Sequence, residues 1–436
     1  MFCRMRQPVE RISRRTLLGG LVAGLTASLG RPAVATSRIG LALEARAESL
    51  ALGPGRAPSQ LWRLTAPAPL VRLARDAALD LGFSNGLSVA AALAGRGLAL
   101  PAPLLGQPAV GPGGRTSIAA TAARAGTGLL DVRLLADHAA LPIRPLPVIV
   151  DEAQPVTVDR DEIFLVEDFR LRPDGSALAP GTEAKDAELV YAINGQIQPE
   201  IALRTHARVR LRIINGCHRA VIAIKIADLD AIRVMAIDSQ PAEPFLARNG
   251  AVVLPPGGRT DVFIDMPAAK APLQVLLHDG TAARPLARLA PSGEPPLRGA
   301  PLPPAPPLPA NGLPDKLDLG KAVRVDLALD GPDWRPAVQF SATSAPAFQA
   351  KAGRVVVLAL ANKTSGTNVV HLHGQPFRLL DRLDDGWKPY WLDTLALEAG
   401  QTQRIAFLAQ QSGRFLLESM AANWAAPRLL RWYEIA

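Results

Sequence analysis

Hydrophobic residues in this chain of 436 residues form short runs that glycine, proline and polar residues interrupt. The clearest alternation lies at residues 208–215, where arginine alternates with valine, leucine and isoleucine. A period of two predicts a half-buried strand. Residues 355–362 form a continuous apolar run that is also typical of a strand. Outside alanine-rich stretches no segment sustains a helical period, so the pattern predicts an all-β protein built from Greek-key β-sandwiches.

The length of the chain suits two or three domains better than one. We expect a first domain at 37–152, a second at 153–290 and a third at 318–436, all of β-sandwich type. Residues 291–317 are rich in proline, which favours an extended conformation without a packed core. This segment is interpreted as a tether between domains or as a docking strip for a partner. Within the second domain, Asn194-Gly195 predicts a tight turn between strands.

The N-terminal segment, residues 1–35, has the features of an export signal. Residues 13–18 (Ser-Arg-Arg-Thr-Leu-Leu) resemble the twin-arginine motif, and a weakly hydrophobic, glycine-rich run follows at 17–29. Ala-Val-Ala at 33–35 offers a cleavage site. The run is too short for a comfortable membrane span; the alternative is a basic helix that stays attached. We expect a periplasmic mature protein that has no stable membrane span.

Charge and cysteine content exclude two further classes. The net charge is +9, but residues 1–35 contain six arginines and one glutamate, which leaves about +4 for the remainder. Without a dense basic tract, nucleic-acid binding has little support. Cys3 would leave with the signal, so Cys217 is alone in the mature chain and no internal disulfide forms. We expect Cys217 to be a small, partly buried residue.

Candidate metal chemistry lies near the C-terminus. His371 and His373 stand two residues apart in an apolar, β-branched run, so on a strand their side chains share one face. Neutral imidazole is a common ligand of copper and zinc. The alternative interpretation is a strand with two hydrogen-bonded histidines.

The surrounding segment, Val370-His-Leu-His-Gly-Gln-Pro-Phe377, resembles the C-terminal copper motif of the multicopper oxidases, which are three-domain cupredoxin proteins. In that family the segment supplies one ligand of the type 1 copper and two ligands of a trinuclear copper cluster. The resemblance places His371 and His373 at the two cluster positions. Asn368 falls at the type 1 position, where an imidazole would be needed.

Three further segments resemble the other copper motifs of the family but lack their ligands. Residues 94–101 and 125–133 follow the outline of the two motifs of the first domain, and residues 412–421 lie where the family has His-Cys-His. By this resemblance Ser419 stands at the type 1 cysteine, and the axial position falls near Leu429. The replaced ligand positions are Ala94, Arg96, Asp131, Arg133, Asn368, Glu418, Ser419, Met420 and Trp424.

The number of histidines agrees with the loss of copper. A complete ligand set in this family needs more histidines than this chain has; its six are His138, His206, His218, His278, His371 and His373. A blue copper centre also needs a thiolate, and Cys217 lies in the wrong domain. We therefore expect no cofactor and no catalytic residue. The residual pair His371 and His373 would need a third donor, for which Glu418 and Met420 are the candidates because their positions face the lost cluster.

Charged residues at the emptied positions suggest a replacement for the metal. A carboxylate at Asp131 and guanidinium groups at Arg96 and Arg133 could fill the site as a buried ion pair. The alternative is that these are unrelated, solvated charges. In the second domain, Arg259 and Asp261 are interpreted as a structural pair.

The resemblance implies a multicopper oxidase-like protein that has lost most of its copper ligands. Among exported members of the family, the copper-free type described for cell division shares these features. We therefore expect a non-catalytic scaffold whose partner is a periplasmic protein of the division apparatus. The alternatives are a divergent copper-dependent oxidoreductase of the same family and a periplasmic copper-binding protein.

Overall fold

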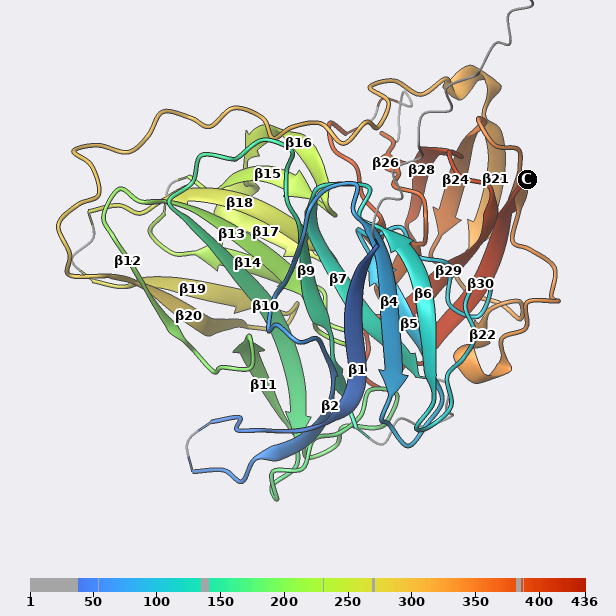
Figure 1. Cartoon of the computed structure of the whole chain (residues 1–436), viewed down its shortest axis with the longest axis horizontal. Coiled ribbons are helices and arrows are strands. Elements are labelled where there is room, and N and C mark those ends of the chain that lie inside the picture. The colour runs from blue at the N-terminus through green and yellow to red at the C-terminus, as the bar shows by residue number, and fades with distance from the viewer. Residues whose placement is uncertain are drawn as a thin grey trace, which may run out of the picture. The chain divides into compact units, whose positions relative to one another are not determined.

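A computed structural model describes residues 38–53, 55–134, 141–229, 231–268, 271–381, 386 and 388–436. The expected signal at residues 1–35 and the histidine at position 138 lie outside these ranges. Residues 38–436 form one compact unit that consists almost entirely of strands (Figure 1), so the all-β prediction is confirmed. The boundaries of the three domains stay a prediction.

The N-terminal third forms two sheets around one hydrophobic core. One sheet has the order β6-β4-β1-β2-β8 and the other β3-β9-β7-β5. Trp62, Phe83 and Leu130 are among the buried residues between them. The strands are β1 (Ile39–Leu50), β2 (Ser59–Thr65), β3 (Val71–Leu73), β4 (Ala78–Asn85), β5 (Ala91–Arg96), β6 (Arg115–Thr121), β7 (Gly126–Leu134), β8 (Ile143–Arg144) and β9 (Leu146–Val150).

The middle third repeats this arrangement with a larger core of isoleucine, leucine and valine. Its sheets have the orders β11-β10-β13-β18-β15-β16 and β12-β20-β19-β14-β17. The elements are β10 (Arg160–Leu171), β11 (Glu188–Ile193), β12 (Glu200–Leu203), β13 (Arg208–Asn215), β14 (Ile222–Ile226), β15 (Arg233–Ile237), β16 (Gln240–Leu246), the 3-10 helix η1 (Arg248–Gly250), β17 (Ala251–Leu254), β18 (Arg259–Asp265), β19 (Leu273–His278) and β20 (Ala283–Pro291).

The C-terminal third contains the aromatic core, in which Phe348 and Phe415 stack on Tyr433. Its sheets are β21-β24-β28-β26 and β22-β30-β29-β25-β27, and β23 also pairs with β30. The elements are η2 (Leu319–Lys321), β21 (Val323–Ala328), β22 (Arg335–Pro336), η3 (Ala337–Gln339), β23 (Gln349–Ala350), β24 (Val355–Ala361), β25 (Asn368–Leu372), β26 (Arg378–Leu379), β27 (Thr394–Leu397), β28 (Thr402–Leu408), β29 (Gly413–Ala421) and β30 (Arg428–Ile435).

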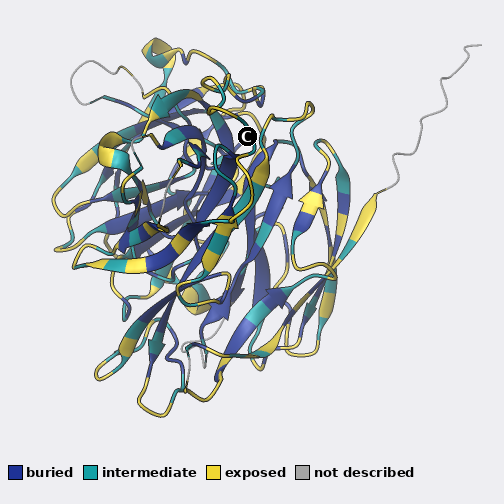
Figure 2. Cartoon of the chain, turned by 90° about the vertical axis from the view of Figure 1, so that its left-hand side faces the viewer, coloured by how far each residue is buried: buried dark blue, intermediate teal, exposed yellow. Residues whose placement is uncertain are grey.

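Strand β13 is present as predicted, but its expected half exposure is wrong because all of its residues are buried. Figure 2 shows that strand centres are buried and turns are exposed in most of the molecule. The arginine face of β13 is buried against acids. Arg210 donates to Asp261 at 2.5 Å, and Arg212 donates to Asp161 at 2.6 Å and to Thr127 of β7 at 3.0 Å. Pairing with carboxylates allows these cations to be buried.

Arg259 and Asp261 do not pair with each other, which corrects the sequence interpretation. Asp261 accepts from Arg210. Arg259 instead donates to Asp393 at 2.7 Å and lies 3.4 Å from Asp238. On one strand, residues i and i+2 share a face, and here each of them binds a different partner on that face.

The tight turn at Asn194-Gly195 is confirmed. Both residues have positive φ, at 52° and 80°, and Ile193 and Gln196 exchange two backbone hydrogen bonds across them. Positive φ at both central residues is the condition for a type I′ turn, which asparagine and glycine meet at low cost.

The proline-rich segment lies between the end of β20 and the start of η2 and contains no strand or helix. It is nevertheless packed against the rest of the chain. Leu308 is buried beside Met235 and Phe263. The Asn311 side chain bonds to both the carbonyl and the amide of Ala125. The segment therefore connects two parts of the chain and also packs against the strands beside it.

Replacing Asp261 by asparagine should destabilise the protein by about 1–3 kcal/mol, because Arg210 and Arg212 lose their shared carboxylate and keep only Glu152 and Asp161. Chemical denaturation followed by tryptophan fluorescence measures this. The exposed Asp330→Asn is the control and should leave the midpoint unchanged. An equally small effect of Asp261→Asn would show that the arginines of β13 do not depend on this carboxylate.

Candidate functional site

The two histidines lie together on the face of one strand, as predicted. His371 of β25 is directly opposite Glu418 of β29, and His373 follows two residues later. The two rings are 4.4 Å apart between centroids, and both side chains are buried. The emptied copper positions of the C-terminal motifs therefore do meet in space.

Hydrogen bonds hold both imidazoles in place. Nδ1 of His371 lies 2.9 Å from the carbonyl oxygen of Asp393 and 3.0 Å from Oγ1 of Thr394. Nε2 of His371 is buried and has no partner among the described groups. Nε2 of His373 lies 2.9 Å from Oε1 of Glu418.

Burial and the nearby cation of Arg96 lower the pKa of His371 to about 3. Burial likewise lowers the pKa of His373, although Glu418 opposes this shift. Both imidazoles are therefore neutral at neutral pH, because their surroundings stabilise the uncharged form.

Glu418 is the centre of the charged groups around the histidines. It accepts from Arg133 at 2.7 and 3.1 Å and from Arg428 at 3.0 Å, and Arg96 lies 4.0 Å away. Burial alone would raise the pKa of Glu418, but the cations of Arg133 and Arg428 lower it well below its usual range. We call Glu418, Arg133, Asp131, Arg428, Arg96 and His373 the Glu418 network.

The predicted ion pair between charged residues of the first domain is confirmed in part. Arg133 pairs with Asp131 and with Glu418. Arg96 forms no ion pair with Asp131 among the described residues. Instead it donates to Oγ1 of Thr394 at 2.7 Å. Arg96 therefore belongs to the same site but on its opposite side, toward His371.

The type 1 positions form a neutral hydrogen-bonded group. Oδ1 of Asn368 accepts from Oγ of Ser419 and from the backbone amide of Met420, both at 3.0 Å. Leu429 lies opposite Ser419 in the register of β29 and β30. Trp424 donates away from this group, to the carbonyl of Ala179 at 3.1 Å.

The remaining replaced positions add no metal donor. Met420 is buried opposite Val369, two pairs beyond His371 and Glu418. Ala94 of β5 lies opposite Asp131 of β7 and has only a methyl side chain. The expected third donors were Glu418 and Met420. Glu418 does approach His373, but its carboxylate oxygens already accept hydrogen bonds from Arg133 and Arg428.

The donor groups present here differ from those of the copper centres that the sequence resembles. The type 1 position lacks a thiolate, and Cys217 is buried beside Val166, more deeply than expected. The described ranges contain no group of three or more His, Cys, Asp or Glu that could hold a metal ion. Guanidinium groups from Arg96, Arg133 and Arg428 surround the histidines, and like charges repel a metal cation.

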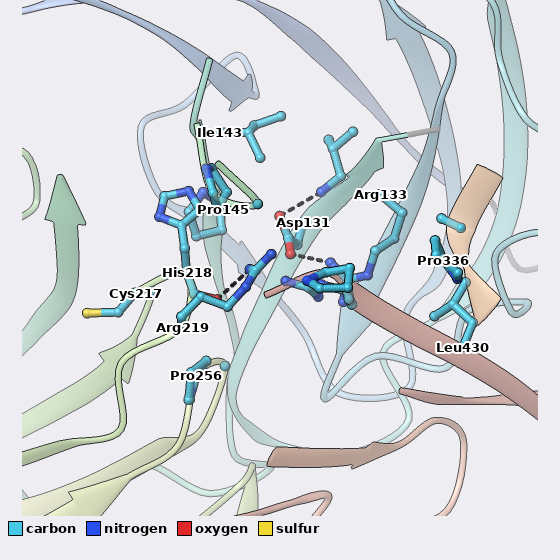
Figure 3. Close-up of a pocket in the computed structure, with 18 of the residues that line it drawn as sticks. Asp131, Arg133, Ile143, Pro145, Cys217, His218, Arg219, Pro256, Pro336 and Leu430 are labelled. Atoms are coloured by element: carbon cyan, nitrogen blue, oxygen red, sulfur yellow. Dashed lines mark hydrogen bonds and ion pairs between the residues drawn. The ribbon is translucent and has the colours of Figure 1, made fainter. Parts of the chain in front are cut away.

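Sequence reasoning missed two arginines of this region. Arg428 at the start of β30 bonds to Glu418, and Arg219, which follows β13, lies nearby at a cavity of about 440 Å³ (Figure 3). Neither stands in a copper motif. Two arginines, Arg428 and Arg431, interrupt the otherwise apolar segment 424–433, and this was the available signal for Arg428. No comparable signal marked Arg219.

Comparisons with known proteins agree with the fold. Residues 316–434 match the family model described as multicopper oxidase. The solved multicopper oxidase from Pseudomonas thermotolerans is 22% identical, with a TM-score of 0.77 over 92% of this chain and 100% of that chain. Lac15 from a marine microbial metagenome is 22% identical, with a TM-score of 0.73 over 92% and 100%. No match was found among curated proteins.

A third solved structure, the McoA multicopper oxidase of Aquifex aeolicus, is 14% identical, with a TM-score of 0.73 over 91% of this chain and 96% of that chain. These likenesses show the fold: residues 38–436 have a cupredoxin-like, all-β fold similar to that of the solved multicopper oxidases. Among the described residues, no helix is long and apolar enough to cross a membrane.

Replacing Glu418 by glutamine should lower the free energy of unfolding by about 1–3 kcal/mol, because the buried Arg133 would keep only Asp131 and the half-buried Arg428 would lose its carboxylate. Urea denaturation measures the change. The exposed Glu243→Gln is the matched control and should behave like the parent protein. A parent-like midpoint for Glu418→Gln would show that the network contributes no net stability.

Stability should decrease as the pH falls from about 7.5 to 5. An unfolded histidine takes up a proton near its ordinary pKa of about 6.5, whereas His371 in the folded protein does not, so the unfolded state is favoured by up to about 1.4 kcal/mol per pH unit for each such histidine. His371→Asn keeps a donor toward the Asp393 carbonyl and removes the titration, so its pH slope should be shallower. An unchanged slope in denaturation titrations would contradict the assignment.

Proposed function

We propose that this chain is a copper-free, non-catalytic member of the multicopper oxidase-like proteins. The observation that supports this most directly is the Glu418 network. It puts guanidinium and carboxylate groups where the resemblance expects the ligands of the copper cluster. Arg133 and Arg428 satisfy Glu418, so the carboxylate is not free to bind a metal.

The type 1 positions support the same conclusion. Without a thiolate at Ser419 there is no blue copper centre, and a copper-dependent oxidase of this family would lack its entry point for electrons. The hydrogen bond between Ser419 and Asn368 completes a neutral polar group in its place. The chain therefore retains the scaffold and lacks the redox chemistry.

For the cellular role we propose a periplasmic scaffold that stabilises the division apparatus, like the SufI/FtsP type. The support is the twin-arginine-like segment at residues 13–18 together with the loss of copper ligands. Site-specific photocrosslinking in cells tests this role. Septal proteins should be captured by the exported chain, and normal division of a deletion strain under envelope stress would count against it.

Metal content tests the absence of copper. The chain exported from copper-supplemented cells should contain far less than one equivalent of copper by elemental analysis and should show no blue absorption band. A copper-loaded multicopper oxidase purified in parallel is the positive control. Stoichiometric copper in this chain would overturn the proposal.

One observation favours a second candidate, a periplasmic copper-binding protein. Nε2 of His371 is buried without a partner and the ring of His373 is 4.4 Å away, so the pair could hold one ion weakly. In that case the double variant His371→Ala, His373→Ala would abolish copper binding. The copper-free proposal expects the parent and this variant to bind equally little.

A further inference from the structure

We propose that the cavity beside the Glu418 network binds a small organic anion, with its carboxylate or phosphate group against Arg219. This inference goes beyond the proposed scaffold role and does not depend on it. It is derived from an arginine without a counter-ion, from the unmatched polar atoms around it and from the size and lining of the cavity.

The cavity has the size and composition of a ligand site. Its volume of about 440 Å³ falls within the range of about 300–1,000 Å³ that is typical of pockets for small molecules. Residues from all three parts of the chain line it. Apolar walls come from Ile143, Pro145, Pro256, Val338 and Leu430, most of which Figure 3 shows around the charged groups.

Arg219 is the unpaired cation of this cavity. Its side chain is 7% exposed and donates only to two carbonyl oxygens, of Ala426 at 3.0 Å and of His218 at 2.8 Å. Within the described part of the chain it forms no ion pair. Asp168 is the acid that most strongly favours its charge, but Asp168 is already bonded to His218.

Burial and repulsion from Arg428 lower the pKa of Arg219 to about 9, so the guanidinium is still charged at neutral pH. A buried charge normally has a partner of opposite sign. An anion in the cavity would supply that partner, and the protein itself does not.

Two more buried polar atoms at this cavity are unmatched. Nε of Arg96 and Nε2 of His218 are buried and have no partner, and both residues line the cavity. Arg96 has only a distant ion pair, at 4.0 Å from Glu418. Buried polar groups are nearly always hydrogen-bonded, so the unused donor capacity of Arg219 and Arg96 around one cavity points to an anionic ligand.

The chemistry of the lining defines the class of ligand. The planar guanidinium fork binds carboxylate and phosphate through two parallel hydrogen bonds. The apolar lining residues favour a ligand that carries a hydrocarbon or aromatic body. Phenyl phosphate and benzoate are therefore suitable probes, and inorganic phosphate tests the contribution of the body.

Isothermal titration calorimetry of the mature chain provides the test. Phenyl phosphate should bind saturably at one site and more tightly than inorganic phosphate. Arg219→Gln should lower its affinity about tenfold or more, since a charge-assisted hydrogen bond is lost. The exposed Arg248→Gln is the matched control and should bind like the parent. A thermal melt verifies that each variant is folded.

A second pair of variants keeps the test independent of Arg219. Val338 at the cavity is 37% exposed, so substitutions there leave the core intact. Val338→Asp should weaken phenyl phosphate binding and Val338→Lys should strengthen it, each by about twofold to fivefold through a partly screened charge.

Several results would overturn the assignment. These are no saturable binding of either organic probe, equal affinity for phenyl phosphate and inorganic phosphate, parent-like binding by Arg219→Gln, or no response to the charge at position 338. Copper content is measured separately, so failure of the anion site and failure of the copper-free proposal are distinguishable.

Discussion

The structure depends on pairing between buried guanidinium and carboxylate groups. Arg133 and Glu418 are 285 positions apart in the chain, and they form a bidentate ion pair with two hydrogen bonds. Arg259 joins the middle third to Asp393 of the C-terminal third in the same way. Burying either charge alone would be costly, so each pair requires its two segments to be packed together. These pairs therefore specify how the sheets are joined.

In the copper-free proposal, the Glu418 network has the organising role that a metal centre has in the oxidases. In the oxidases that the sequence resembles, ligands from distant segments meet at a copper cluster. Here Arg133 and Glu418 bring the same segments together without a metal. Guanidinium and carboxylate groups satisfy each other through hydrogen bonds, whereas several neutral imidazoles in one place would require a cation. On this proposal, the exchange preserves the fold without the redox chemistry.

Arg219 is the exception to this complete pairing. Natural proteins retain strained or unsatisfied groups mainly where function uses them. The arginines of the Glu418 network each reach a carboxylate, Arg96 at 4.0 Å, but Arg219 forms no ion pair among the described residues and lines a cavity that also has apolar residues. Stability alone would favour a neutral residue there, and this contrast is why the cavity is interpreted as a binding site.

The sequence by itself determined the all-β class, the turn at Asn194, the common face of His371 and His373 and the absence of a thiolate ligand. These features follow from local periodicity and residue chemistry. Only the tertiary structure decided that the arginines of β13 are buried, that Arg428 donates to Glu418 and that Arg219 has no counter-ion among the described residues. The reason is physical: a charge becomes buried or paired according to which distant segment packs against it, and no local pattern encodes that segment.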